Sequence, residues 1–207
     1  DHQAEENRKH FEEHGIFAIN LMSSPGAGIT SLLERTIELL KDLRIGVIEG
    51  DLETDRDAQR IRAKGAPAVQ ISTGSACHLD AFMVHKGIHG LPLEELDLVF
   101  IENVGNLVCP ASYDVGAHMN VVLLSVVEGD DKPEKYPVMF KGAQLMVITK
   151  IDLLPFVDFS IERAINSARK VNPHMDIIRL SAKTGEGMED WLDYIRFKVK
   201  AYKRALV

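Results

Sequence analysis

The chain has 207 residues, of which 45% are hydrophobic and 27% charged, and its formal net charge at pH 7 is -7. This length fits one α/β domain, or at most two small ones, and buries a sufficient core without disulfides or structural metals. The acidic balance argues against nucleic acid or an anionic membrane as the main partner. No apolar run approaches the roughly 20 residues that cross a bilayer, and the first residues are unlike a signal peptide. We expect a cytoplasmic protein. Its two cysteines, Cys77 and Cys109, are more typical of free thiols in a reducing cytosol than of a disulfide framework.

After a polar segment at residues 1–15, which we interpret as a helix or a mobile arm, apolar and periodic segments alternate along the chain. The apolar runs predict strands at 16–22, 44–49, 68–71, 96–102, 120–127, 144–149 and 176–180. The periodic segments predict helices from about 31, over 54–64, near 79–86 and over 188–202. This order predicts an α/β three-layer sandwich, with a mostly parallel sheet of about seven strands and helices on both faces.

Residues 23–31 read Ser-Ser-Pro-Gly-Ala-Gly-Ile-Thr-Ser and follow a predicted strand. They match the phosphate-binding pattern GxxxxGK[ST], whose backbone N–H groups surround a phosphate while a lysine contacts the outer phosphates. The hydroxyl at the last position, here Thr30, binds Mg²⁺ and makes this residue a catalytic candidate. The residues expected to bind a nucleotide are Ser24, Pro25, Gly26, Ala27, Gly28, Ile29, Thr30 and Ser31.

Two positions depart from this pattern, because Ser23 replaces the first glycine and Ile29 replaces the lysine. We expect the branched apolar side chain of Ile29 to face phosphates or solvent. Loss of one charge-assisted contact costs about 1.5–3 kcal/mol in binding, and the cost grows where charge shifts onto the phosphates in a transition state. Hydrolysis by this chain is therefore expected to be impaired. A glycine-rich turn without a ligand is the alternative interpretation.

Two later segments predict a guanine site. Thr149-Lys150-Ile151-Asp152 follows a predicted strand and has the form [NT]KxD, in which the Asp152 carboxylate accepts hydrogen bonds from guanine N1–H and the exocyclic amine. Adenine cannot supply this pair of donors. Ser181, Ala182 and Lys183 follow the last predicted strand and fit the other side of the same base through backbone N–H groups. Together the segments favour GTP over ATP.

Carboxylates at strand ends indicate a Mg²⁺ site and a phosphate-sensing loop. Glu102 ends a predicted strand and precedes Asn-Val-Gly, which has the form DxxG with glutamate in place of aspartate. Glu102 can hold Mg²⁺ through water, and Gly105 can offer its N–H to a γ-phosphate. Asp51 can orient water or bind Mg²⁺, whereas Asp55 and Asp57 are equally well interpreted as solvated loop charges.

The pair Cys77-His78 and the later Cys109 all follow predicted strand ends, so they can meet in space. Two thiolates and an imidazole suit zinc or nickel. Three ligands do not close a tetrahedral site, so water, a fourth group or a second chain would complete it. The alternative is two buried free cysteines and a hydrogen-bonded histidine.

Two further sets of histidines have helical spacing, namely His78, His85 and His89, and His10 and His14. Gly87 and Gly90 make one continuous helix through the first set doubtful. Either set could bind a metal weakly, but we interpret both as solvent-facing histidines.

Together these motifs resemble the hydrogenase-maturation nickel-insertion GTPases, the HypB family of dimerising P-loop GTPases. The resemblance covers residues 15–200, and its most specific part is the Cys-His pair with the later cysteine. It rests on SSPGAG with Thr30, EGDLETDRDA at 49–58, TGSACHLDA at 73–81, IENVGNLVCP at 101–110, VVLLSVVEGDDKPEKYP at 121–137 and TKIDLLP at 149–155.

The resemblance implies a P-loop NTPase fold, with an arm or helix at 1–15 and one GTPase domain with metal-binding segments at 16–207. It implies GTP or GDP with Mg²⁺ at the interface of a nucleotide-dependent homodimer, and Ni²⁺ or Zn²⁺ on Cys77, His78 and Cys109. It also implies delivery of nickel, with a partner nickel metallochaperone, to the precursor of a [NiFe]-hydrogenase large subunit. A binding module with little or no hydrolysis, and a urease-type nickel accessory GTPase, are the alternatives.

Overall fold

A computed structural model gives the fold of the chain and describes residues 2–51 and 55–207, the side chain of Asp51 excepted. One parallel sheet of seven strands forms its centre, in the order β3-β2-β4-β1-β5-β6-β7. The strands are β1 (Phe17–Ser23), β2 (Ile45–Asp51), β3 (Ala68–Ser72), β4 (Leu98–Glu102), β5 (Met119–Ser125), β6 (Leu145–Thr149) and β7 (Asp176–Arg179). The predicted three-layer α/β sandwich is confirmed.

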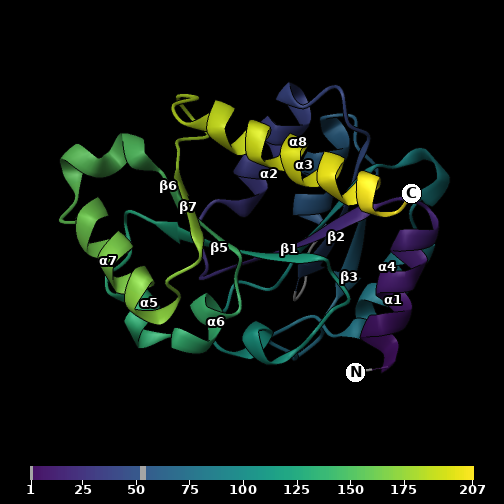
Figure 1. Cartoon of the computed structure of the whole chain (residues 1–207), viewed down its shortest axis with the longest axis horizontal. Coiled ribbons are helices and arrows are strands. Elements are labelled where there is room, and N and C mark those ends of the chain that lie inside the picture. Colours follow the sequence, from purple (N-terminus) through teal and green to yellow (C-terminus); the bar gives the residue numbers. More distant parts are fainter. Residues whose placement is uncertain (1, 52–54) are drawn as a thin grey trace.

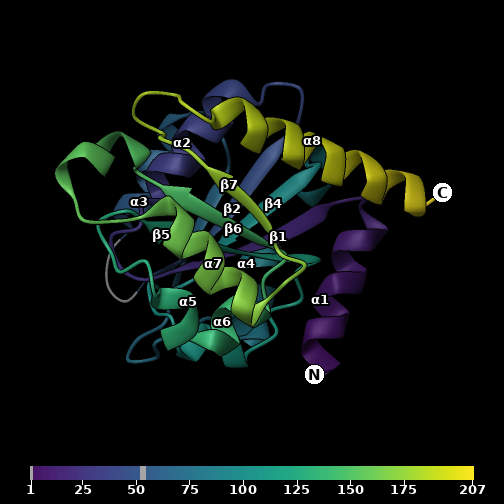
Figure 2. The ribbon, with the colours of Figure 1, turned by 60° about the vertical axis from the view of Figure 1, so that its left-hand side comes forward.

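Helices cover both faces of this sheet (Figures 1 and 2). Those on one face are α2 (Ile29–Leu39), α3 (Arg56–Ala63) and α8 (Met188–Ala205). Those on the other face are α1 (His2–Glu13), α4 (Ala81–His89), α5 (Lys132–Lys135), α6 (Pro137–Lys141) and α7 (Ile161–Val171). Short 3₁₀ turns are η1 (Leu93–Glu95), η2 (Cys109–Ser112) and η3 (Ile151–Phe156).

The burial of the strands explains why their sequences are apolar almost throughout. Every residue of β1, β4 and β6 is buried, because helices cover both sides of each strand. The fully buried Trp191 of α8 packs on the same face as α2, and its indole Nε1 donates a hydrogen bond to Thr36 Oγ1 at 2.9 Å. These contacts hold the helices on the sheet. Ligands of such folds bind in the loops at the carboxyl ends of the strands.

Residues 2–13 form a docked helix, so the alternative of a mobile arm is wrong. Ala4, Asn7 and Phe11 of α1 are buried. The Asn7 amide Nδ2 donates to the carbonyl oxygens of Ala81 and Val115, at 2.8 and 3.1 Å. These bonds attach α1 to the start of α4, a contact between segments more than seventy residues apart.

Gly87 does not interrupt α4, which runs without a break to His89. One continuous helix through His78, His85 and His89, which the glycines made doubtful, does not form, because His78 precedes α4. A Cβ atom at Gly87 would lie 2.9 Å from Ile48 Cγ2, so the glycine allows α4 to approach β2 closely. The helices α5, α6 and α7 were not predicted. Within the described ranges, no helix combines the length and the apolarity that a membrane span requires.

Candidate nucleotide and metal sites

The phosphate loop connects β1 to α2 as its motif requires. Gly26 and Gly28 have φ angles of 80° and 93°, which side-chain-bearing residues rarely adopt. Gly28 is also the N-cap of α2, so no side chain caps the first turn of this helix. Free N–H groups and the helix dipole make this terminus a favourable place for a phosphate.

A cavity of about 510 Å³ opens over this loop, as predicted for a nucleotide. The predicted residues Ser24 to Ser31, Glu102 and Gly105 line it. Its other lining residues are Ser23, Gly50, Asp57, Arg60, Asn103, Val104 and Lys150. The structure therefore brings the phosphate loop and the strand ends of β2, β4 and β6 to one place.

Three carboxylates form a cluster at the wall of this cavity. One oxygen of each of Glu49, Asp57 and Glu102 lies within 4.8 Å of the others. Glu49 and Glu102 are opposite each other in the β2–β4 register and are only 1% and 8% exposed. Thr30 Oγ1 lies 3.1 Å from Glu102 Oε1. This all-oxygen set fits Mg²⁺, which prefers carboxylate, hydroxyl and water oxygens.

Sequence reasoning placed Thr30 and Glu102 correctly beside each other but missed Glu49 and left Asp57 undecided. A signal was present, since Glu49 is a carboxylate near the carboxyl end of an otherwise apolar strand. The predicted Mg²⁺ or catalytic role of Asp51 concerns a side chain outside the described residues.

Ile29 does not face phosphates or solvent, so that prediction is wrong. The side chain is 7% exposed and belongs to the core between the sheet and α2. Burial away from water stabilises this apolar group, which explains its orientation. The cations among the described residues that line the cavity are Arg60 and Lys150. Arg60 forms an ion pair with Glu34 and donates to Ser31 Oγ at 3.4 Å.

The loop after β4 lies directly on the phosphate loop. A Cβ atom at Gly105 would lie 3.0 Å from Pro25 Cα, so only glycine fits without displacement. The backbone N–H of Asn106 donates to the Ser23 carbonyl at 2.7 Å. A phosphate that binds the Gly105 N–H would therefore also displace the residues that follow Gly105 in this loop.

The predicted base-binding residues surround a second, adjoining cavity of about 260 Å³. Lys150, Asp152, Ala182 and Lys183 line it, together with Gly28 of the phosphate loop. Ser181 Oγ donates to Asp152 Oδ1 at 2.8 Å, which orients the carboxylate. Within the described ranges, Lys150 is the one non-glycine residue with positive φ, at 62°, a conformation that concentrates at binding sites.

We expect Asp152→Asn to weaken GDP binding by about a hundredfold, because two hydrogen bonds to a charged acceptor contribute about 1.5–3 kcal/mol each. Fluorescence titration with a labelled GDP measures this loss. Asp158→Asn is the matched control, since Asp158 is an exposed carboxylate six residues further on. Equal affinities for the two variants would contradict the assignment of this cavity to the base.

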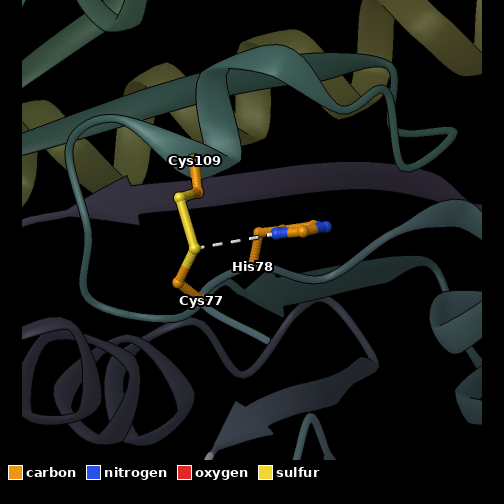
Figure 3. A group of neighbouring side chains, drawn as sticks. All are labelled: Cys77, His78 and Cys109. Atoms are coloured by element: carbon orange, nitrogen blue, oxygen red, sulfur yellow. Dashed lines mark hydrogen bonds between the residues drawn. A yellow bond between two sulfur atoms is a disulfide. The ribbon is translucent and has the colours of Figure 1, made fainter. Parts of the chain in front are cut away.

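The three predicted metal ligands meet at the end of the sheet (Figure 3). Ligand atoms of Cys77, His78 and Cys109 all lie within 4.8 Å of one another, with Cys77 Sγ 3.9 Å from His78 Nδ1. The two sulfurs form a disulfide, with a Cα–Cα distance of 6.2 Å. The expectation of free cysteines is therefore wrong for this structure, because the residues are close enough to pair. Thiolates, not disulfide sulfurs, are metal ligands, so a metal requires the reduced pair.

Two asparagines of the loop that follows β4, residues 103–108 and here called the β4 loop, hold the segments that carry Cys77 and Cys109 in place. Asn103 Oδ1 accepts from the N–H of Leu79, next to His78, at 3.0 Å. Asn106 Oδ1 accepts from the N–H of Cys109 at 3.1 Å. The His78 ring stacks on Tyr113, with centroids 3.7 Å apart. Sequence reasoning missed these supporting residues.

His78 lies outside α4, so the predicted alignment with His85 and His89 on one helix face is wrong. The helix begins at Ala81 because the Asp80 side chain accepts from Met83 N–H at 2.9 Å and caps it. His78 instead lies in the preceding loop, with its Nδ1 edge 3.9 Å from Cys77 Sγ and the rest of its ring extending away from the two sulfurs in Figure 3.

The fold, the glycine loop and the base cavity define the chain as a P-loop nucleotide-binding protein. Residues 17–179 match the family model described as CobW/HypB/UreG, nucleotide-binding domain. The chain is 58% identical over 196 residues to the hydrogenase maturation factor HypB of Azotobacter vinelandii, covering 94% of this chain and 65% of that protein. The chain thus spans about two thirds of the length of this relative and of two others, the HypB proteins of Azotobacter chroococcum and Rhizobium leguminosarum.

Solved structures agree with this relationship. HypB from Helicobacter pylori in complex with nickel matches with a TM-score of 0.94 and 43% identity, over 97% of this chain and 95% of that chain. HypB from Archaeoglobus fulgidus matches with a TM-score of 0.89 and 42% identity, over 96% and 97% of the two chains. The chain belongs to the CobW/HypB/UreG family and, within it, to HypB.

Proposed function

We propose that the chain is a GTP-dependent nickel metallochaperone for the large subunit of a [NiFe]-hydrogenase. The observation that carries the proposal is the β4 loop, which contacts the phosphate loop and both metal-binding segments. The relatives are named hydrogenase maturation factors, which favours the hydrogenase type over the urease type, and the H. pylori structure is described as a nickel complex.

The proposed coupling follows a short chain of contacts. Ser23 of the phosphate loop accepts from Asn106 N–H, and the Asn106 side chain accepts from Cys109 N–H. In the same loop, Asn103 accepts from the N–H that follows His78. A γ-phosphate that binds Gly105 N–H would shift the loop and thereby change the spacing of the ligands. GTP and GDP would then give the site different metal affinities, which is the requirement for a nucleotide-controlled switch.

Hydrolysis is the proposed release step. A water oxygen attacks the γ-phosphorus, the bond to the β–γ bridging oxygen breaks, and GDP and phosphate leave. Mg²⁺, when bound, neutralises charge on the phosphate oxygens, and Thr30 and Glu102, with Glu49 and Asp57, are the residues that would hold it. Of the two cations among the described residues that line the cavity, Lys150 and Arg60, Lys150 makes the shorter contact with the phosphate loop, because its Nζ donates to the Gly26 carbonyl at 2.7 Å.

The proposed assembly is a nucleotide-dependent homodimer in the cytoplasm, where a reducing environment keeps the two thiols available. Cys77, His78 and Cys109 leave a tetrahedral Ni²⁺ or Zn²⁺ site one ligand short, which a second copy could fill. Apolar side chains beside the cluster are exposed, Val108 by 61% and Tyr113 by 44%, and suit a protein contact. A partner nickel metallochaperone and the hydrogenase precursor are the proposed donor and client.

Native mass spectrometry of the reduced chain tests the proposal, with GTP, GDP or ATP and with Ni²⁺ or Zn²⁺. We expect guanine nucleotides to bind in preference to ATP, and GTP to favour a dimer that holds metal. In Asn106→Ala, the ratio of the nickel affinities of the GTP and GDP forms should fall at least about twofold, because a hydrogen bond worth about 0.5–1.5 kcal/mol is lost between the β4 loop and Cys109.

Asn166→Ala on the exposed face of α7 is the matched control and should leave that ratio unchanged. Asn106→Ala itself should still bind GDP and nickel separately. A nickel affinity that is the same with GTP and GDP in the unaltered chain would contradict the coupling.

A second candidate function is a nucleotide- and metal-binding module without turnover. The burial of Ile29 favours it, because the residue at the lysine position is turned into the core and leaves no cation there. Single-turnover phosphate release from bound GTP separates the two candidates.

A further inference from the structure

A second group of imidazoles lies apart from both sites, where α1 packs against α4. The ring centroids of His10 and His14 are 5.4 Å apart, those of His10 and His89 are 6.0 Å apart, and those of His85 and His89 are 4.5 Å apart. Each helix contributes one i,i+4 pair, the spacing that places two side chains on one helix face. The two sequence motifs interpreted as separate solvent-facing histidines therefore form one cluster.

The packing of the two helices holds this cluster together. The Asn7 amide joins α1 to the first residue of α4, and the buried Phe11 lies one residue after His10. A Cβ atom at Gly116 would lie 2.6 Å from the Ala4 carbonyl oxygen, so the chain also contacts α1 closely from another side. Both views show α1 lying against the body of the protein, beside α4 in Figure 1.

The pair on α4 has the separation of two ligands on one ion. His85 Nε2 and His89 Nε2 are 3.1 Å apart. Metal–nitrogen bonds of about 2.0–2.1 Å at angles of about 90–110° place two ligand nitrogens about 2.8–3.4 Å apart. Without a metal, one nitrogen carries the proton that the other accepts. A bound ion would take the lone pairs of both Nε2 atoms, so the ring that now carries its proton on Nε2 would hold it on Nδ1 instead, with no net release of protons.

The pair on α1 is suited to complete such a site. His14 Nδ1 lies 3.1 Å from the His10 carbonyl oxygen, which can only accept, so this Nδ1 carries the proton and Nε2 keeps its lone pair. Burial and the neighbouring His14, His89 and His85 lower the pKa of His10, against an opposing effect of Glu13, which favours the neutral ring that a metal needs. His14 and His89 are exposed, so an ion could enter from solvent.

We propose that His10, His14, His85 and His89 form a second metal site, for a divalent first-row transition ion such as Ni²⁺ or Zn²⁺. Imidazole nitrogen suits both ions. His85 and His89 are already at chelating separation, and the proposed site requires the His10 and His14 side chains to rotate toward the same ion. Because the site has no thiolate ligand, it would hold its ion whether the Cys77–Cys109 pair is reduced or oxidised.

Equilibrium dialysis of the Cys77→Ser/Cys109→Ser double variant against Ni²⁺ alone, and against Zn²⁺ alone, tests this site. We expect one ion per chain to remain bound. Addition of His85→Asn and His89→Asn should weaken that binding about a hundredfold, because both ligands at chelating separation are lost. His10→Asn alone should weaken it about tenfold, the lower end of the roughly 10–100-fold loss in metal affinity that removal of a supporting group causes. His174→Asn is the matched control, because His174 is an exposed histidine in the loop before β7.

X-ray absorption of the nickel-loaded double variant should show nitrogen and oxygen neighbours without sulfur. GDP affinity and the thermal midpoint report whether each variant is folded, and both should match those of the control. The proposal is overturned if the double variant binds neither metal, or if binding survives His85→Asn/His89→Asn. The outcome is independent of the proposed GTPase function, because nucleotide is absent from the dialysis.

Discussion

Ile29→Lys is expected to bind GTP about tenfold or more tightly than the original chain, and to hydrolyse it faster. A charge-assisted hydrogen bond to a phosphate contributes about 1.5–3 kcal/mol, equal to a factor of roughly 10 to 150 in affinity. The gain in rate should exceed the gain in binding, because charge shifts onto the phosphate oxygens in the transition state.

The substitution also has a cost, since Ile29 is 7% exposed and packs in the core. A lysine can keep its methylene stem against apolar neighbours while the ammonium group extends into the cavity of about 510 Å³. We therefore expect the free energy of unfolding to fall by about 1 kcal/mol in the absence of nucleotide. Bound GTP should restore more stability to the variant than to the original chain, because stabilisation by a ligand rises with the logarithm of the ratio of its concentration to Kd.

Ile29→Met is the matched control, since methionine is unbranched and flexible like lysine but carries no charge. Its GTP affinity should stay within about twofold of the original, because no charge-assisted contact is gained. Fluorescence titration and single-turnover phosphate release measure both quantities. Equal gains for methionine and lysine would contradict the electrostatic explanation, and an Ile29→Lys variant without turnover would contradict the proposed hydrolysis.

The sequence was sufficient for features that depend on local pattern. Apolar runs gave the strands to within three residues at either end, because both faces of this sheet are buried and the signal is strong. Glycines with obligatory positive φ made the phosphate loop recognisable. Strand-end motifs met in space because the carboxyl ends of parallel strands share one edge, which brought Cys77 and Cys109 together across 32 residues.

Features that depend on pairing between distant elements could not be predicted in this way. Burial of Ile29 follows from how α2 packs on the sheet, and Glu49 joins Glu102 only through the β2–β4 register. The docking of α1 on α4 depends on the Asn7 amide, whose partners are 74 and 108 residues away. The histidines of α1 and those of α4 looked like two separate sets in the sequence for the same reason.

Oxidation state should decide whether the Cys77–His78–Cys109 cluster binds nickel. In the reduced chain we expect sulfur-to-nickel charge-transfer absorption at one ion per chain, because two thiolates and an imidazole form a suitable site. In the disulfide form that absorption should be absent, since a disulfide sulfur carries no thiolate charge. Reduction requires two electrons and two protons, which a dithiol supplies together; with a phosphine, the phosphine supplies the electrons and water supplies the protons and the oxide oxygen. Loss of the thiol protons then frees the ligands.

Single substitutions should reproduce the effect of oxidation without changing the nucleotide site. Cys109→Ser should weaken nickel binding at this cluster about a hundredfold or more. The binding free energy of a structural metal site, about 10–16 kcal/mol, is shared among only a few ligands, so each ligand contributes several kcal/mol. GDP affinity should be unchanged, because Cys109 does not line the nucleotide cavity. Tyr113→Phe is the matched control, since phenylalanine keeps the ring that stacks on His78 at 3.7 Å and removes no ligand.

The charge-transfer band is the decisive measurement here, because total nickel content would include ions on the four histidines of α1 and α4. A band of equal strength in the oxidised chain, or in Cys109→Ser, would contradict the assignment of these residues as ligands. A band that is lost on oxidation, while one nitrogen-bound ion remains, would separate the two metal sites within one chain. It would also show that the Cys77–His78–Cys109 cluster, and not the four histidines of α1 and α4, holds the proposed nickel cargo next to the β4 loop, which contacts the phosphate loop.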